Sequence, residues 1–242
     1  MPRDKLNIII PIYNPHAGWE DIFVDSLLEM EKELNETDYT VILVNDGSSR
    51  GISNLEDIKE KFKCLKYFSY PVNMGKGYAI RYGISHSVAD FYIYTDIDFP
   101  FGCRIIRQTY ELLKSSKTDI VIGTRDRSYF AMLPIERRII SSMLKRINFL
   151  ITGFKIKDTQ AGLKGLNNEA RKILENTKTN SFIFELEFLH KSIKQGLSFK
   201  TIKVSCKPGI KFTNFSTRII WKEIKSFLKI FLNIGKEDTI NL

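Results

Sequence analysis

Two aspartates separated by one residue, Asp96 and Asp98, offer the clearest chemistry in the sequence. Carboxylate oxygens are ligands that Mg²⁺ and Mn²⁺ accept, so the pair could hold a divalent cation that carries a diphosphate. The pair follows residues 91–95, an aromatic and β-branched run that predicts a buried strand, and Pro100 comes soon after it. Ligands of open α/β sheets bind at the carboxyl ends of strands, where this pattern places both aspartates. The alternative is an ordinary polar loop after a strand.

Two earlier apolar runs also end in polar loops. Residues 7–12 predict a strand that ends at Tyr13-Asn14-Pro15, and residues 39–44 predict another that leads to Asp46. Between them, residues 19–34 have the apolar spacing of a crossover helix. A carboxylate in the position of Asp46 could bind a nucleotide base or ribose, or it could cap its own turn through backbone amides.

A third polar loop, Gly75-Lys76-Gly77, precedes an expected helix and follows an expected strand near residues 65–70. Glycines flanking a lysine let backbone amides and an ammonium group approach phosphate oxygens. The spacing is not that of a Walker P-loop. Three successive strand and helix units of this kind predict a doubly wound, nucleotide-binding sheet.

Taken in order, these motifs resemble the pattern of glycosyltransferase family 2, whose members have the GT-A fold. The resemblance implies an α/β protein with a Rossmann-like, mostly parallel sheet flanked by helices, and a nucleotide-sugar donor. It also implies a cofactor, Mg²⁺ or Mn²⁺, held by Asp96 and Asp98. The donor contacts that it implies are Pro11, Tyr13, Asn14, Asp46, Gly75, Lys76 and Asp96.

The second half of the chain is similar to one branch of this family, the dolichyl-phosphate glucosyltransferases and, more distantly, the dolichol-phosphate mannose synthases. Residues 158–164 resemble the branch's Asp-Thr-Gln-Cys-Gly-Phe-Lys signature, and residues 184–187 resemble its Phe-Asp-Val-Glu. Pro15 and Pro100 depart from the pattern, in which Glu and Gln respectively are common. The departure at Pro15 implies that one nucleotide contact is missing or supplied elsewhere, and the departure at Pro100 implies fewer protein ligands and more water around the cation. The similarity fades after 204, which predicts a catalytic domain over 1–204 and an extension over 205–242.

The resemblance implies an inverting enzyme that moves a hexose from a UDP- or GDP-sugar to a polyprenyl phosphate. A phosphate monoester has a second pKa of about 6, so this acceptor would need no general base at neutral pH. The alternative is a saccharide acceptor in capsule or surface polysaccharide synthesis, whose hydroxyl would need a base, Asp158 or Glu185. Glu185 and Glu187 would diverge on a helix and share a face on an extended segment. The catalytic residues predicted in this way are Asp98, Asp158 and Glu185, with Arg125, Arg138 and Ser142 as implied contacts of the lipid phosphate.

Composition narrows the class of protein. A chain of 242 residues with 43% hydrophobic residues suits one α/β domain with a small addition. The formal net charge of +9 is concentrated in 125–157 and 203–236, which could meet nucleic acid, an anionic membrane or phosphorylated substrates, or simply be solvated. A nucleic-acid-binding protein on a degenerate transferase fold is the least favoured interpretation, because the site carboxylates are retained. The three cysteines are odd in number and far apart, which argues against disulfides and structural zinc.

The chain has no run of roughly 20 apolar residues, so we expect a cytoplasmic protein. Its last part nevertheless has the pattern of an amphipathic helix, in which apolar residues recur at helical spacing beside a stripe of lysines. Such a helix could bind an anionic membrane surface from the cytoplasmic side, or it could pack on the catalytic domain. The residues concerned are Ile220, Ile224, Phe227, Leu228, Phe231 and Leu232, with Lys222, Lys225 and Lys229.

Overall fold

The computed structural model describes residues 4–52, 55–125, 158, 161–181 and 183–207. It contains a seven-stranded sheet in the order β3-β2-β1-β4-β6-β5-β7. The strands are β1 (Lys5–Ile12), β2 (Asp38–Asp46), β3 (Leu65–Tyr70), β4 (Phe91–Tyr94), β5 (Ile120–Arg125), β6 (Lys164–Asn167) and β7 (Phe199–Val204). The helices are α1 (Trp19–Glu33), α2 (Leu55–Lys61), α3 (Lys76–Ser85), α4 (Arg104–Ser116), α7 (Asn168–Glu175) and α8 (Phe184–Lys194).

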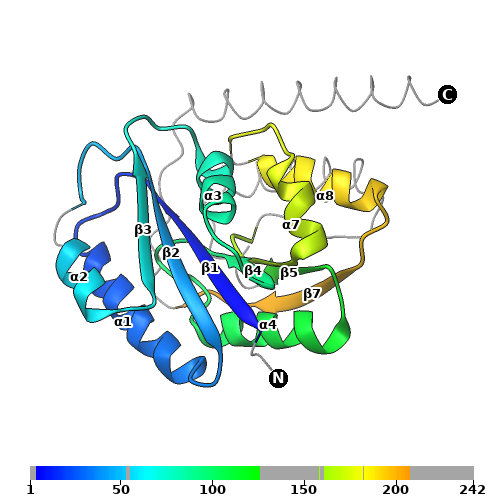
Figure 1. The fold of residues 1–242 in the computed structure, drawn as a ribbon, viewed down its shortest axis with the longest axis horizontal. Coiled ribbons are helices and arrows are strands. Elements are labelled where there is room, and N and C mark those ends of the chain that lie inside the picture. The colour runs from blue at the N-terminus through cyan, green and yellow to red at the C-terminus, as the bar shows by residue number, and fades with distance from the viewer. Residues whose placement is uncertain (1–3, 53–54, 126–157, 159–160, 182, 208–242) are drawn as a thin grey trace.

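Helices cover both faces of this sheet, so the described part of the chain has three layers (Figure 1). One apolar cluster joins the sheet to α1, α2 and α4, through side chains such as Phe23, Ile58 and Ile106. The other joins it to α3, α7 and α8, through side chains such as Ile80 and Phe188. Because strands covered on both faces bury all their side chains, β1 and β2 read in the sequence as nearly continuous apolar runs.

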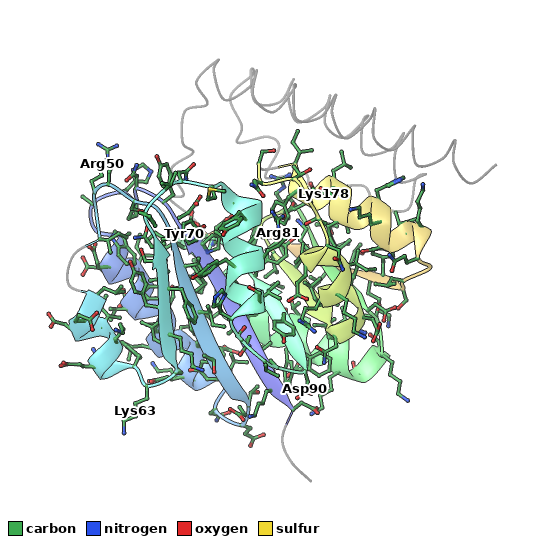
Figure 2. The ribbon with its side chains drawn as sticks, turned by 45° about the horizontal axis from the view of Figure 1, so that its top comes forward. Arg50, Lys63, Tyr70, Arg81, Asp90 and Lys178 are labelled. Carbon is green, nitrogen blue, oxygen red and sulfur yellow. The ribbon has the colours of Figure 1, made fainter. Side chains whose placement is uncertain are left out.

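Six strands run in one direction and β6 runs against its neighbours. The pairings β1 with β2, β1 with β4, β2 with β3 and β5 with β7 are parallel, whereas β6 is antiparallel to both β4 and β5. The carboxyl ends of the parallel strands therefore share one edge of the sheet with the first residue of β6, Lys164. Figure 2 shows Arg50 and Tyr70 near this edge, and Lys63 and Asp90 at the opposite end of the molecule.

Most of the expected elements lie where the sequence predicted them. The crossover helix expected over 19–34 is α1, and the strand expected near 65–70 is β3. The strand before the two aspartates ends at Tyr94, one residue earlier than expected, although the amide of Thr95 still donates to the carbonyl of Ile9 (3.2 Å). Strand β6 was not predicted, because its residues read as part of a polar, glycine-containing segment.

Some predictions fall outside the described residues. The amphipathic helix expected in the last part of the chain, over residues 220–232, lies there. The boundary proposed after 204 coincides with the end of β7, and residue 207 still contacts the domain, since its amide donates to the carbonyl of Pro100 (2.8 Å). The division into 1–204 and 205–242 stays a prediction.

The close approach of α3 to the sheet depends on Gly83. A Cβ atom at this position would lie 2.8 Å from Cγ2 of Ile9 and 2.9 Å from Cγ2 of Val44. Real Cβ atoms do not approach other side chains so closely, and both partners are fully buried in β1 and β2. The helix therefore packs at this distance only because residue 83 has no side chain.

We expect Gly83→Ala to lower the free energy of unfolding. Alanine favours the helical state by about 1 kcal/mol, but overpacking a tight core costs about 1–3 kcal/mol. Urea denaturation measures the difference, and Ser85→Ala, on the exposed side of the same helix, is the control for helix propensity. A Gly83→Ala variant as stable as the wild type would contradict the packing argument.

Candidate functional site

The carboxyl edge of the sheet gathers most of the predicted site residues that the structure describes. Asp46 ends β2, Lys76 begins α3, and Asp96 and Asp98 follow β4. Arg125, which ends β5, lies at the same edge. These positions come from segments far apart in the sequence, and the parallel arrangement of the strands is what brings them together.

Asp96 is held on two sides. Its Oδ1 lies 2.6 Å from the Nζ of Lys76, whose side chain is 15% exposed. On the other side, a Cβ atom at Gly162 would lie 2.1 Å from Oδ2 of Asp96, so any side chain there would displace the carboxylate. Burial alone would lower the pKa of Lys76, but the carboxylates of Asp96 and Glu185 outweigh it and raise this pKa above its usual value. Lys76 is therefore an ammonium ion in contact with Asp96.

Asp98 is exposed and is not ion-paired with any residue that the structure describes. Partial loss of hydration, followed by repulsion from Asp96, raises the pKa of Asp98 above its usual value. A divalent cation between the two carboxylates would remove this repulsion. The described residues include no group of three His, Cys, Asp or Glu side chains that could hold a metal. Two carboxylates are nevertheless enough for Mg²⁺, which takes its other ligands from water and substrate phosphates, so the residues present fit such a cation.

Asp46 is buried, and its carboxylate is used within the protein. It accepts hydrogen bonds from the hydroxyl of Tyr70 (2.9 Å), the side-chain amide of Asn73 (2.8 Å) and the backbone amides of Met74 (2.7 Å) and Gly75 (2.9 Å). Burial, and then the carboxylate of Asp46, raise the pKa of Tyr70. This geometry is a capping role, although the amides capped belong to the loop before α3 rather than to Asp46's own turn. A contact between Asp46 and a nucleotide stays a prediction.

The two glycines around Lys76 are explained by close packing. The amide of Gly75 donates to Asp46, and the amide of Gly77 donates to the carbonyl of Asn180 (2.9 Å). Cβ atoms at these glycines would lie 2.5 Å from the carbonyl oxygen of Asn180 and 2.7 Å from Cβ of Phe184. Both amides are therefore already bonded to the protein, whereas the sequence led us to expect them on phosphate. The role of Gly75 as a donor contact stays a prediction.

Asn14 ties the loop after β1 to the loop after β2. Its Oδ1 accepts from the amides of Ser49 (2.9 Å) and Arg50 (3.3 Å), and its own amide donates to the hydroxyl of Ser48 (2.9 Å). Tyr13 beside it is 52% exposed, which leaves its ring available to a ligand. The contacts predicted between the donor and Pro11, Tyr13 and Asn14 stay predictions.

Arg125 and Asp158 form a buried, two-pronged ion pair. The Nε and Nη2 of Arg125 donate to the two oxygens of Asp158, both at 2.8 Å, and the amide of Arg125 adds a third bond (3.0 Å). The two side chains are 11% and 6% exposed. Asp158 therefore fixes the end of β5, and its role as a base stays a prediction.

Glu185 and Glu187 lie in the first turn of α8 and diverge, as expected for a helix. Glu185 points toward the sheet, where its Oε2 lies 2.6 Å from the Nζ of Lys164 and its Oε1 accepts from the hydroxyl of Tyr94 (3.2 Å). Lys164 has no exposed surface, and burial lowers its pKa even though Glu185 opposes the shift. Sequence reasoning missed Lys164 and Tyr94, since nothing in their spacing links them to residue 185.

Glu187 turns the other way and holds the loop between α7 and α8. Its carboxylate accepts from the amides of Lys178 (2.9 Å) and Thr179 (2.8 Å) and lies 2.8 Å from the Nζ of Lys191. Arg81 on α3 binds the same loop through the carbonyl of Thr179 (2.8 Å), and Figure 2 shows Arg81 and Lys178 close to each other on this side of the molecule. The remaining two predicted residues, Arg138 and Ser142, lie outside the described residues.

A family model described as "Glycosyl transferase family 2" matches residues 7–174, which is more than half of the chain. The chain belongs to this family. The predicted membership is thus confirmed, and the four ordered loop motifs that indicated it all lie at the carboxyl edge of the sheet or begin the helix beside it. Among the described residues of this family 2 chain, no helix is both long and apolar enough to cross a membrane.

Two curated relatives carry the name dolichyl-phosphate beta-glucosyltransferase. The Saccharomyces cerevisiae protein is 27% identical over 221 residues, which cover 83% of this chain and 66% of that protein. A Trichomonas vaginalis protein, ALG5D, is 27% identical over 206 residues, which cover 78% of this chain and 61% of that protein. This family 2 chain therefore spans about two thirds or less of the length of each relative.

The fold is shared with a solved structure of glucosyl-3-phosphoglycerate synthase from Mycobacterium tuberculosis, in complex with Mn²⁺, UDP and glucosyl-3-phosphoglycerate. The TM-score is 0.65 at 13% identity, and the match covers 95% of this chain and 79% of the other. The predicted GT-A architecture, a mostly parallel sheet between layers of helices, is confirmed.

The bonds of the Glu187 carboxylate predict how the stability of the fold depends on pH. Burial alone would raise its pKa, but Lys191 and the amides of Thr179 and Lys178 outweigh it, so the pKa is lower in the folded chain than in the unfolded chain. The stabilisation is therefore complete above the usual glutamate pKa of about 4.3 and is lost as the pH falls through the lower folded value.

We expect Glu187→Gln to lower the free energy of unfolding by about 1–3 kcal/mol at pH 7, and by much less at pH 3. Chemical denaturation at the two pH values measures both differences. Glu169→Gln, which removes an exposed ion pair with Lys172 on α7, is the control and should change little at either pH. An equal effect of Glu187→Gln at both pH values would argue against the ionised carboxylate as the cause.

Proposed function

We propose that this family 2 chain is an inverting glycosyltransferase that moves a hexose from a UDP- or GDP-sugar to a polyprenyl phosphate. The observation that carries the donor half of this proposal is the arrangement of Asp96, Asp98 and Lys76 at the carboxyl edge of the sheet. Two carboxylates and an ammonium group at one edge suit the diphosphate of a nucleotide sugar and the cation that accompanies it. The names of the two dolichyl-phosphate relatives support the acceptor half.

Asp96 and Asp98 would hold Mg²⁺ or Mn²⁺, and the related fold solved with Mn²⁺ and UDP supports this choice. Such a cation acts as a Lewis acid on the oxygens of the leaving nucleoside diphosphate. Lys76 supplies a second positive charge at the same place, because its ammonium is already 2.6 Å from Asp96. The further contacts that we propose for the donor are Pro11, Tyr13, Asn14, Asp46 and Gly75.

The two candidate bases, Asp158 and Glu185, are both ion-paired, which favours a phosphate acceptor over a saccharide acceptor. Asp158 is bound through both oxygens by Arg125, and Glu185 is bound by the buried ammonium of Lys164. To contact an acceptor hydroxyl, either carboxylate would have to give up bonds to its buried cation. A phosphate monoester, already ionised at neutral pH, needs neither of them.

The remaining parts of the proposal come from the sequence. Arg125, Arg138 and Ser142 are proposed contacts of the lipid phosphate because of the resemblance. A guanidinium can bind two phosphate oxygens at once, and this mode is proposed for Arg138, because Nε and Nη2 of Arg125 already bind Asp158. The basic, amphipathic end of the chain would bring the enzyme to an anionic membrane surface on the cytoplasmic side as a peripheral protein. Nucleic acid is not a proposed partner.

We expect Asp98→Asn to reduce transfer by at least about 100-fold, since a cation contributes several kcal/mol to such a transition state and each 1.4 kcal/mol is a factor of ten. Thermal stability should barely change, because Asp98 is exposed. Transfer of labelled sugar and Mn²⁺-dependent thermal stabilisation by UDP or GDP are the two measurements. Asp25→Asn, an exposed change on α1, is the control. Full activity of Asp98→Asn, or of the wild type in excess EDTA, would refute the metal assignment.

The acceptor proposal predicts a specific pH profile. With polyprenyl phosphate, kcat/KM should rise with pH through one ionisation near pH 6, that of the acceptor phosphate, and stay level above it. Polyprenol without phosphate and free saccharides should accept no sugar from the same labelled donor. Efficient transfer to a saccharide, with a profile set by an ionisation of the enzyme, would favour the polysaccharide alternative.

A further inference from the structure

Lys164 is the most deeply buried charged residue that the structure describes. It has no exposed surface, it begins β6, and its Nζ lies 2.6 Å from Oε2 of Glu185 and 2.7 Å from the carbonyl oxygen of Ala161. Replacing a buried ion pair by apolar side chains of similar size is often neutral or stabilising. The stability of the core therefore does not explain why a lysine stands here.

The contact with Ala161 leads directly to the proposed cation site. The carbonyl of Ala161 accepts from Lys164 and from the amide of Leu163 (2.6 Å), which fixes a tight turn. The next residue in that turn, Gly162, lies so close to Asp96 that a Cβ atom would be 2.1 Å from Oδ2 and 2.9 Å from Cγ. The turn therefore packs beside the carboxylate with no room for a side chain between them.

The ion pair of Lys164 and Glu185 is also linked to Asp96 through the neighbouring strand β4. Tyr94 lies directly across from Lys164 in the antiparallel pairing of β4 and β6, and its hydroxyl donates to Oε1 of Glu185 (3.2 Å). Asp96 follows Tyr94 by two residues. The end of β4 is thus bonded to Glu185 and the turn before β6 to Lys164, so the ion pair of these two residues joins both segments beside Asp96.

The ion pair of Lys164 and Glu185 also lies near Lys76, the ion-pair partner of Asp96. Phe184, the residue before Glu185, packs against Gly77, where a Cβ atom would lie 2.7 Å from that of the phenyl side chain. Gly77 follows Lys76, whose Nζ contacts Asp96. The start of α8 therefore supports the carboxylate and the ammonium together.

We propose that Lys164 and Glu185 are positioning residues, which hold the Ala161-Gly162 turn against Asp96 and so set the geometry of the nucleotide-diphosphate site. Lys164 does not touch substrate, because no part of it is exposed. This inference gives Glu185 a role other than that of a general base. It rests on the proposed function, since it assumes that Asp96 binds the cation on the donor.

The test compares Lys164→Met with Leu166→Ala. Leu166 lies two residues along β6, on the same face and fully buried, so its truncation destabilises the same strand without a link to Asp96. One measurement is calorimetric binding of Mn²⁺ with UDP or GDP, whichever stabilises the wild type more. The other is amide hydrogen exchange at residues 161–163.

We expect Lys164→Met to weaken nucleotide binding by about 10-fold or more, in the range seen when the support of a metal ligand is removed. It should also speed exchange at residues 161–163, whereas Leu166→Ala should lower the melting temperature and leave the affinity unchanged. The double variant Lys164→Met/Glu185→Gln contains no unpaired buried charge, so it should regain thermal stability and still bind the nucleotide weakly.

Wild-type affinity in Lys164→Met or in the double variant, or unchanged exchange at residues 161–163, would overturn the positioning role. Equal loss of affinity in Leu166→Ala would also overturn it, because general destabilisation would then explain the effect. A wild type that binds neither nucleotide would instead refute the proposed function, and the exchange measurement would still decide whether Lys164 holds the turn.

Discussion

Charge compensation at the carboxyl edge of the sheet is the constraint on which the site depends. Three cations are each matched to one carboxylate: Lys76 to Asp96, Lys164 to Glu185 and Arg125 to Asp158. Each buried cation needs its carboxylate partner, because an unpaired charge in the interior costs several kcal/mol. Asp98 remains, exposed and without an ion-pair partner among the described residues. The protein thus compensates its buried charges internally, and the proposed cation would neutralise the remaining negative charge that Asp98 places beside Asp96.

Hydrogen bonds from side chains to backbone groups, together with close packing at glycines, also fix this edge of the sheet. Asp46 orders the loop before α3, and the loop between α7 and α8 is held by Arg81 and Glu187. Gly77 and Gly162 lie where a side chain would collide with Phe184 or Asp96. These contacts link β2, β4 and α3 to the start of α8. The site of Asp96 and Asp98 is therefore preorganised before a ligand binds.

The antiparallel strand β6 connects the two halves of the sheet. It lies between β4 and β5 and brings the turn at Ala161 and Gly162 to the end of β4. A parallel strand in this place would present its last residue, rather than Lys164, at the carboxyl edge. The reversal of one strand is therefore what joins the second half of the chain to the Asp96 carboxylate.

The sequence by itself determined the strands β1 to β4, the crossover helix α1 and the family, because buried parallel strands are continuous apolar runs and each ends in a loop of recognisable residue types. It also determined that Asp96 and Asp98 share an edge with Asp46 and Lys76. It did not predict β6 or the burial of Lys164, since a lysine in a glycine-containing segment reads as a solvent-exposed residue.

Only the tertiary structure decided what the polar groups of these loops do. Asp46 and the amides of Gly75 and Gly77 looked available to a nucleotide, yet they bond to segments up to about a hundred residues away. Glu185 looked like a possible base, yet it is paired with Lys164. The physical reason is that the state of a carboxylate depends on burial and on its nearest cation, and both are set by the pairing of distant strands and helices rather than by local sequence.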